Sequence, residues 1–426
     1  MPGFVYTWPY TIRQNQNSLM EVLEMSIRSR SFVSVCLAAC VLNIGYGMIT
    51  PVLPLYANEL GMTTMMISMM FSAYALVKLL SNMPGGFLSD VIGARTLLVL
   101  VTPLFAVATF LMTINRQPAL FSVLRGLEGL ADGLAVPAIY AVIVRSIPSK
   151  QQGQAIGMLT SFATVGGALG PALGGALVSV WNYNAPFYIT SALALVTTLI
   201  LLVGVQKSET HGDTKLDISL SAAIKDYMKA LRPRRSSLLL YGAGVLALFG
   251  ELTYVSLESM GPLYMSIKLS ANPSLVGLFF TINLVVFATF SPLAGHLVDR
   301  LGAARLSAQA TIGILVVLVL SALALSFTAF LVIFVFEFLL AALLFTSTQT
   351  LASGSLAEQK RSGTAFGVMA TIRSVGALAG PFLAAVMYEA NPRLLFPMVA
   401  LVGAICLGFF VLLNNQAQRQ AQWHPS

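Results

Sequence analysis

Eight charged side chains lie inside apolar segments that are long enough to cross a lipid bilayer. A charge at the bilayer centre costs about 2.5–3.5 kcal/mol on insertion scales, so eight charges facing lipid would cost roughly 20 kcal/mol or more. These side chains must therefore line a wet cavity or pair with one another. The eight are Lys78, Arg125, Glu128, Asp132, Glu251, Glu258, Glu337 and Arg373.

The acidic members of this set are candidates for binding and releasing a proton. Asp132, Glu251 and Glu337 have no basic neighbour at pairing distance on their own helix. Desolvation favours a neutral acid and a cation across the cavity favours the carboxylate, and proton coupling requires that competition. We predict that Asp132, Glu251, Glu337 and Glu128 are the proton-coupling residues, which bind and release protons. Glu258, near the outer end of its segment, is expected to be an ordinary interfacial charge.

Arg125, Glu128 and Asp132 are spaced i, i+3, i+7 and therefore share one helix face. The first two fit an internal ion pair that fixes the helix, and they fit a functional role equally well. The three cations Lys78, Arg125 and Arg373 either receive an anionic substrate or balance the acids of the cavity.

Polar and aromatic residues near these charges suit an organic substrate that is partly apolar. Asn43 and Tyr46 stand 208 residues before Glu251 and Tyr254, and this symmetry favours all four as cavity residues. Interhelical packing is the alternative for each aromatic ring. The predicted substrate-binding residues are Lys78, Arg125, Arg373, Asn43, Tyr46, Tyr74 and Tyr254.

The composition is that of a polytopic membrane protein. The 426 residues are 57% hydrophobic and only 9% charged, whereas a soluble domain carries about 25% charged residues. The three cysteines, in apolar runs, are expected to be buried thiols. No metal-ligand cluster, hydrolase signature or nucleotide-binding loop occurs in the sequence. We therefore expect neither an enzyme nor a cofactor, and we attribute the net charge of +8 to topology rather than to nucleic-acid binding.

Twelve apolar segments are predicted to span the bilayer, because a span needs roughly 20 apolar residues. Most lysines and arginines fall on the side of the two termini, which predicts that both termini are cytoplasmic. The predicted spans are 31–56, 64–88, 96–115, 118–144, 153–180, 186–206, 237–265, 273–297, 304–326, 328–352, 363–388 and 394–414.

The spans form two groups of six, separated by one long polar stretch. That linker, 207–236, contains a sequence that fits a short amphipathic helix on the membrane surface. The predicted organisation is a cytoplasmic segment (1–30), a six-helix bundle (31–206), the linker (207–236), a second bundle (237–414) and a cytoplasmic tail (415–426).

The two bundles are related in sequence. The stretch 85–95 recurs at 294–305, which aligns Asp90 with Asp299 and Gly93 with Gly302. The stretch 150–157 recurs at 360–367, and the tripeptide PLY recurs at 262–264. An offset of 208 to 210 residues with the same topology indicates a parallel duplication of six helices, the plan of one transporter architecture.

At these motifs the chain resembles the major facilitator superfamily over its whole length. The loop signature of that family matches Gly86, Asp90, Gly93 and Arg95, and the second copy matches Gly295, Asp299, Arg300 and Gly302. The resemblance implies an all-α fold of two six-helix bundles with pseudo-two-fold symmetry. It also implies that this loop is a cytoplasmic latch between the halves. The sequence "RGLEG" at 125–129 resembles a second family signature, with Glu128 where Gln is common.

The stretch 157–175 carries a glycine-rich signature that the resemblance associates with proton-driven exporters. Its fixed positions are Gly157, Gly166, Gly170, Pro171, Gly174 and Gly175, and the second copy retains Gly380 and Pro381. Glycines four residues apart form a ridge that lets two helices touch closely in lipid, and proline bends the helix. A pivoting contact and a static packing motif both fit this pattern.

The resemblance to twelve-span drug:proton antiporters favours a proton-coupled exporter of small amphiphilic molecules. One alternative is a dedicated exporter of an anionic metabolite, such as a carboxylate siderophore, and another is a receptor that does not transport. The expected partners are a small-molecule substrate, protons and the lipid bilayer, with no nucleic acid. A functional monomer in a bacterial inner membrane is expected.

Overall fold

The computed structural model describes residues 30–148, 151–206, 235–355 and 362–423. Within these ranges the chain is helical, and twelve helices are long and apolar enough to cross a membrane. The chain is thus an integral, multi-pass membrane protein with the predicted all-α fold. Most of the predicted N-terminal segment (1–30) and linker (207–236), including the proposed surface helix, lies outside the described residues, as do Lys360 and Arg361.

The helices follow the order of the predicted spans. In the first half they are α2 (Arg30–Ile49), α3 (Val52–Glu59), α4 (Thr64–Leu88), α5 (Ala94–Ile114), α6 (Pro118–Ser146), α7 (Gln152–Val180) and α8 (Ala185–Gly204). In the second half they are α10 (Arg235–Leu269), α11 (Pro273–Leu301), α12 (Ala303–Ser321), α13 (Phe327–Ser355), α14 (Ser362–Ala390) and α15 (Leu395–Trp423). Two short turns of helix, η1 (Ser89–Gly93) and η4 (Pro392–Leu394), join neighbouring elements.

Most helix ends lie within four residues of the expected spans, and three differences are larger or of another kind. The first span consists of α2 and α3, which are separated at Thr50 and Pro51 because proline supplies no backbone N–H to the helix. The ninth ends at Ser321 rather than at 326. The last helix continues to Trp423 and so includes most of the predicted tail, 415–426.

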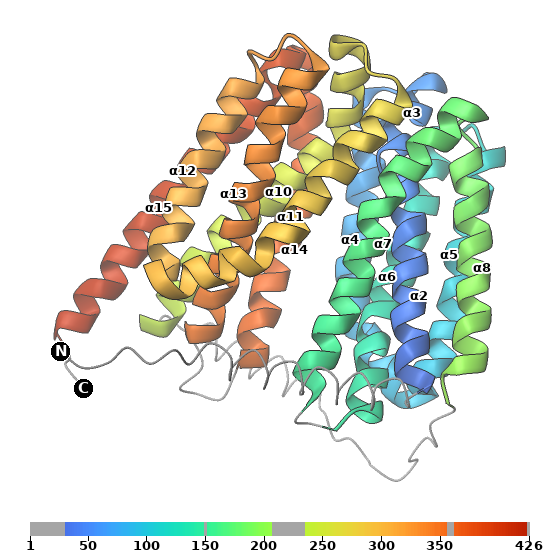
Figure 1. Cartoon of the computed structure of the whole chain (residues 1–426), viewed down its shortest axis with the longest axis horizontal. Helices are drawn as coiled ribbons and strands as arrows, with labels where there is room; N and C mark the ends of the chain where they lie inside the picture. Colours follow the sequence, from blue (N-terminus) through green and yellow to red (C-terminus); the bar gives the residue numbers. More distant parts are fainter. Residues whose placement is uncertain (1–29, 149–150, 207–234, 356–361, 424–426) are drawn as a thin grey trace, which may run out of the picture.

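The two halves form separate bundles that meet near one end of the molecule (Figure 1). They touch through α4 with α14 and through α7 with α11. We call the end that carries α3 the closed end, and the end where α8 stops and α10 starts the open end, because the bundles diverge towards it (Figure 1).

Serine and threonine hydroxyls join the two halves at the closed end. Ser68 of α4 donates to the carbonyl of Pro381 (2.7 Å), and Ser72 donates to that of Leu378 (2.9 Å). Across the other contact, the amide of Ala172 donates to the Thr281 hydroxyl (3.0 Å). The helices that carry the duplicated prolines, α7 with Pro171 and α14 with Pro381, thus expose backbone groups that the opposite half satisfies.

The glycine ridge of α7 packs on α2 of its own half. A Cβ at Gly166, Gly170 or Gly174 would meet α2 backbone, from Cys40 to Met48. Gly175 instead faces Pro273 of the other half, so the signature serves two different contacts. A Cβ at Gly157 would meet nothing within 4 Å.

The second copy repeats this packing on a smaller scale. Gly376 and Gly380 of α14 face the carbonyls of Leu248 and Leu252 on α10. Both halves therefore use small residues to bring the fifth span of each bundle against the first.

The duplicated loop motif forms a tight connection at the open end of each half. Gly93 and Gly302 have φ of +87° and +88°, values that favour glycine. Asp90 accepts a hydrogen bond from Arg145 of α6 at 2.9 Å, within the first half. In this conformation, and among the described residues, no hydrogen bond or ion pair joins the motif to the opposite half. A Cβ at Gly86 or Gly295 would meet only ordinary contacts, at 3.9 Å.

Candidate functional site

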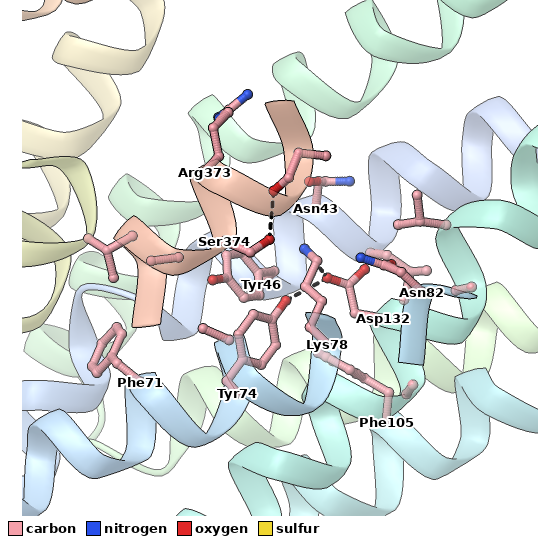
Figure 2. Close-up of a pocket in the computed structure, with 18 of the residues that line it drawn as sticks. Asn43, Tyr46, Phe71, Tyr74, Lys78, Asn82, Phe105, Asp132, Arg373 and Ser374 are labelled. Atoms are coloured by element: carbon pink, nitrogen blue, oxygen red, sulfur yellow. Dashed lines mark hydrogen bonds and ion pairs between the residues drawn. The ribbon is translucent and has the colours of Figure 1, made fainter. Parts of the chain in front are cut away.

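A cavity of about 740 Å³ lies between the two halves. Its walls come from α2, α4, α5 and α6 on one side and from α10 and α14 on the other. Most predicted substrate-binding residues line it, namely Asn43, Tyr46, Tyr74, Lys78, Tyr254 and Arg373. Figure 2 shows Lys78, Tyr74 and Asp132 pointing towards one another, with Arg373 and Ser374 on a separate helix.

An ion pair on the first half links α4 to α6. The Lys78 ammonium lies 2.5 Å from the Asp132 carboxylate, and the Tyr74 hydroxyl donates to the same carboxylate at 2.6 Å. Both charged side chains are about one third exposed, at 37% and 30%. Asp132 therefore has a cation that its own helix does not provide, supplied by α4.

A second ion pair lies on the other half. Arg373 of α14 donates from Nε (3.0 Å) and Nη2 (2.5 Å) to Oε2 of Glu251 on α10. The guanidinium carbon lies 5.0 Å from the centre of the Phe345 ring, a cation–π contact. The cavity thus presents one acid–base pair from each half, and neither cation is free of a carboxylate.

Arg125 and Glu128 are buried behind the cavity wall rather than lining it. Arg125 donates to Glu128 at 2.6 Å, and Thr109 of α5 donates to the same carboxylate at 2.6 Å. The guanidinium also packs against three rings, of which Tyr74 is nearest at 4.7 Å. Of the two roles that the sequence left open for this pair, the geometry favours fixing α6 to α5 and to the aromatic wall. It gives Arg125 no direct contact with the cavity.

Two acids differ from their expected surroundings. The expectation of an interfacial Glu258 is wrong, because the residue is only 5% exposed and lines the cavity between the halves. Glu337 is buried in α13 and lines neither described pocket, and no ion pair involves it within the described ranges.

Several lining residues were missed by sequence reasoning. Asn82, Thr102 and Ser374 are neutral polar residues in apolar segments, and they line the cavity beside the charged groups. The sequence gives only a weak indication of this role, because serine, threonine and asparagine side chains elsewhere in the chain donate hydrogen bonds to the backbone of their own helix. Ser374 does so as well, donating to Ala370 at 2.9 Å.

Other sequence expectations have mixed outcomes. Cys36 and Cys406 are buried free thiols as expected, and Cys40 is half-buried. No group of side chains that could hold a metal ion occurs within the part of the chain that the structure describes.

Comparison with known proteins agrees with this architecture. The quinolone resistance protein NorA of Staphylococcus aureus is 25% identical over 380 residues, which cover 88% of this chain and 94% of that protein. An uncharacterised MFS-type transporter of Methanocaldococcus jannaschii is 25% identical over 359 residues, or 82% of this chain and 89% of the relative.

Solved structures share the fold at low identity. A bacterial homologue of the human lysosomal transporter Spinster, in an inward-facing and unoccupied conformation, superimposes with a TM-score of 0.79 at 16% identity, covering 94% of this chain and 99% of that one. A mutant of the nucleoside transporter NupG gives 0.74 at 12% identity, covering 91% and 99%. A family model described as Major Facilitator Superfamily matches residues 35–269 and 252–424. The family and the fold are those of membrane transporters of small molecules, and this chain belongs to the Major Facilitator Superfamily.

Proposed function

We propose that this protein is a proton-coupled exporter of small amphiphilic organic molecules that works by alternating access. The observation that carries the proposal is a cavity between two duplicated bundles, closed at one end by contacts between them and lined by an acid–base pair from each. Both pairs are within reach of a molecule entering from the open end. The similarity to a quinolone resistance protein supports efflux, and a quinolone is the first substrate to test.

Proton coupling is proposed for Asp132 and Glu251, because protonation of either carboxylate would release its cation. The released cation, Lys78 or Arg373, would then repel a cationic substrate and change the arrangement of the cavity wall. A bound substrate that displaces a proton from the same group would produce exchange, which is the chemistry of an antiporter.

Glu337 is proposed as a further proton site, on grounds of symmetry. It follows Glu128 by 209 residues, and at the same offset Arg125 is replaced by Phe334 and Thr109 by Leu318. The second half has therefore kept the acid but lost both groups that hold Glu128. We propose that Glu337 binds and releases a proton as its carboxyl group alternately gains and loses access to water. Glu128, held by Arg125 and Thr109, is the weakest of the four predicted coupling residues.

Alternating access requires the closed-end contacts to part while the open ends meet. The hydroxyl bonds of Ser68, Ser72 and Thr281 are few and individually worth about 1 kcal/mol, so separating them is feasible. We propose that Asp90 and Arg145 then meet the second half and act as the latch. The distribution of basic residues favours an open end that faces the cytoplasm, with the protein in a bacterial inner membrane as a functional monomer.

The alternative of a dedicated anion exporter finds less support. It relied on Lys78, Arg125 and Arg373, and each of these lies against a carboxylate, at 2.5, 2.6 and 2.5 Å respectively. An anion would have to displace a carboxylate to bind there. We therefore favour cationic or neutral amphiphiles.

Uptake into inverted membrane vesicles tests the proposal. A fluorescent quinolone should accumulate when the vesicle lumen is acidic, and an uncoupler should abolish the accumulation. Accumulation that persists unchanged with the uncoupler would reject proton coupling, and binding without any flux would favour the receptor alternative.

A further inference from the structure

A second chamber adjoins the charged cavity and takes no part in the proton coupling proposed above. Its volume is about 440 Å³, and it lies between α2, α7, α10 and α11. Its walls are mostly apolar, with Ala163 and Pro171 on α7 facing Phe280, Leu284 and Phe287 on α11. A volume of this size falls within the range of ligand pockets, about 300–1,000 Å³.

The two chambers adjoin each other at a set of side chains that line both. The residues that line both are Asn43, Tyr46, Tyr140, Tyr254 and Glu258. A ligand that reaches the charged chamber from the open end therefore meets the apolar chamber at this junction. The junction therefore carries three tyrosines and one carboxylate, which lie next to the apolar chamber.

Glu258 differs from the other cavity acids in its partners. Asp132 and Glu251 each contact a cation, whereas Glu258 has none within 4.0 Å among the described residues. Tyr254 stands one turn away on α10 and lines the same two chambers. Among the residues that line the apolar chamber, Glu258 alone carries a formal charge. The junction thus contains an acid without an ion-pair partner, beside three tyrosines.

We propose that the apolar chamber is a binding subsite for organic cations, with Glu258 holding the cationic nitrogen and the chamber holding the hydrocarbon body. Tyrosine faces attract such cations, and the carboxylate supplies a negative charge with which neither Lys78 nor Arg373 pairs, because each of them binds another acid. The inference rests on the proposed function and names the substrate class of its cavity. Glu258 is therefore a specificity-determining residue, separate from the proton-coupling acids.

Equilibrium binding to the full-length protein in lipid nanodiscs tests this assignment without any gradient. The probes are n-alkyltrimethylammonium ions from butyl to octyl, titrated calorimetrically against protein-loaded and empty nanodiscs. Each added methylene should tighten binding about fourfold while the chamber fills. Glu258→Gln should weaken every member at least tenfold and keep that chain-length dependence. Octanol, a neutral probe, should bind the variant as it binds the parent protein, which shows that the site is folded.

A second variant tests the apolar part. Leu284→Trp places a larger ring in the chamber, so the gain per methylene should vanish while the butyl compound keeps its affinity. Leu293→Trp, at an exposed position on the same helix, and Glu59→Gln, an exposed acid, are the matched controls and should change nothing.

Equal binding of the cations to Glu258→Gln and parent protein would overturn the proposal. So would a chain-length dependence that Leu284→Trp leaves intact. Octyl sulfate binding as tightly as the octyl cation would indicate an unselective hydrocarbon pocket, and would also overturn it. A protein that binds in the expected pattern but carries no proton-driven flux would reject the proposed function and leave this inference standing.

Discussion

Arg373 binds Glu251 through two hydrogen bonds, from Nε at 3.0 Å and Nη2 at 2.5 Å, and so joins α14 to α10 at the cavity wall. Both N–H groups converge on the single oxygen Oε2, so the contact fixes the direction of the guanidinium as well as its charge. The pair is about one quarter exposed, at 32% for Arg373 and 23% for Glu251. Its contribution to the free energy of unfolding therefore lies between that of a surface pair, below about 1 kcal/mol, and the roughly 3–5 kcal/mol that is lost when a buried pair is broken.

We predict that Arg373→Gln destabilises the protein by about 1–2 kcal/mol, because Glu251 is left without its cation. The double variant Glu251→Gln with Arg373→Gln should recover more than half of this loss. Thermal unfolding in detergent, run as a double-mutant cycle, measures both effects. Additive losses would mean that the two side chains do not interact.

Arg125 is predicted to be structural rather than a substrate contact. Arg125→Ala should lower the free energy of unfolding by about 3–5 kcal/mol, because it leaves Glu128 buried without its cation. Thr109→Val removes one hydrogen bond to Glu128 and should lower it by about 1 kcal/mol. Unfolding temperature and quinolone affinity, measured on the same samples, separate the two roles. Normal stability with weakened substrate binding would place Arg125 in the binding site instead.

The glycines of α7 are predicted to differ sharply in tolerance. Gly174→Ala puts a methyl group against the Met48 backbone of α2, and overpacking of this kind costs about 1–3 kcal/mol. Gly157→Ala has open space around it and should leave stability unchanged. Yield and unfolding temperature of the two purified variants test this contrast. If Gly157→Ala destabilised the protein as much as Gly174→Ala, the packing described for α7 would be incorrect.

The closed end is predicted to depend on the hydroxyls of Ser68 and Ser72. Replacing both by alanine removes two bonds between the halves, about 2 kcal/mol in total, and should shift the population towards a conformation that is open at that end. Spin labels at Asn58 and Arg393, exposed residues of opposite halves, report the change in a background without native cysteines. Thr289→Val is the control, because Thr289 bonds only its own helix. An unchanged distance distribution would show that the hydroxyls do not hold this end.

The sequence predicted the architecture well because its signals are local. Apolar length located the spans, and the repeat at a constant offset predicted two equivalent bundles. The glycine ridge on α7 follows from spacing alone, because residues four apart lie on one face of any helix. The break at Pro51 and the length of α15 were missed. Hydropathy does not show where a span is interrupted, and it does not show that a helix continues beyond its apolar residues.

The site was predicted only in part because its contacts join distant segments. The sequence marked Lys78 and Asp132 as charges inside spans, but their pairing depends on how α4 crosses α6. Arg125, Glu128 and Asp132 share a helix face, yet only Asp132 lines the cavity, because Thr109 of α5 binds Glu128 and aromatic rings cover Arg125. Glu258 was misjudged because depth along α10 does not reveal that the halves close over it.

The central claim is that substrate and protons are exchanged through the acids of this cavity. The most direct measurement is the luminal pH of proteoliposomes that contain purified protein, an acidic lumen and a trapped pH-sensitive dye. Adding a quinolone outside should raise luminal pH as substrate enters, and Asp132→Asn, Glu251→Gln or Glu337→Gln should reduce that response at least tenfold. Substrate entry that leaves luminal pH unchanged, or responses in all three variants equal to that of the parent protein, would contradict the account.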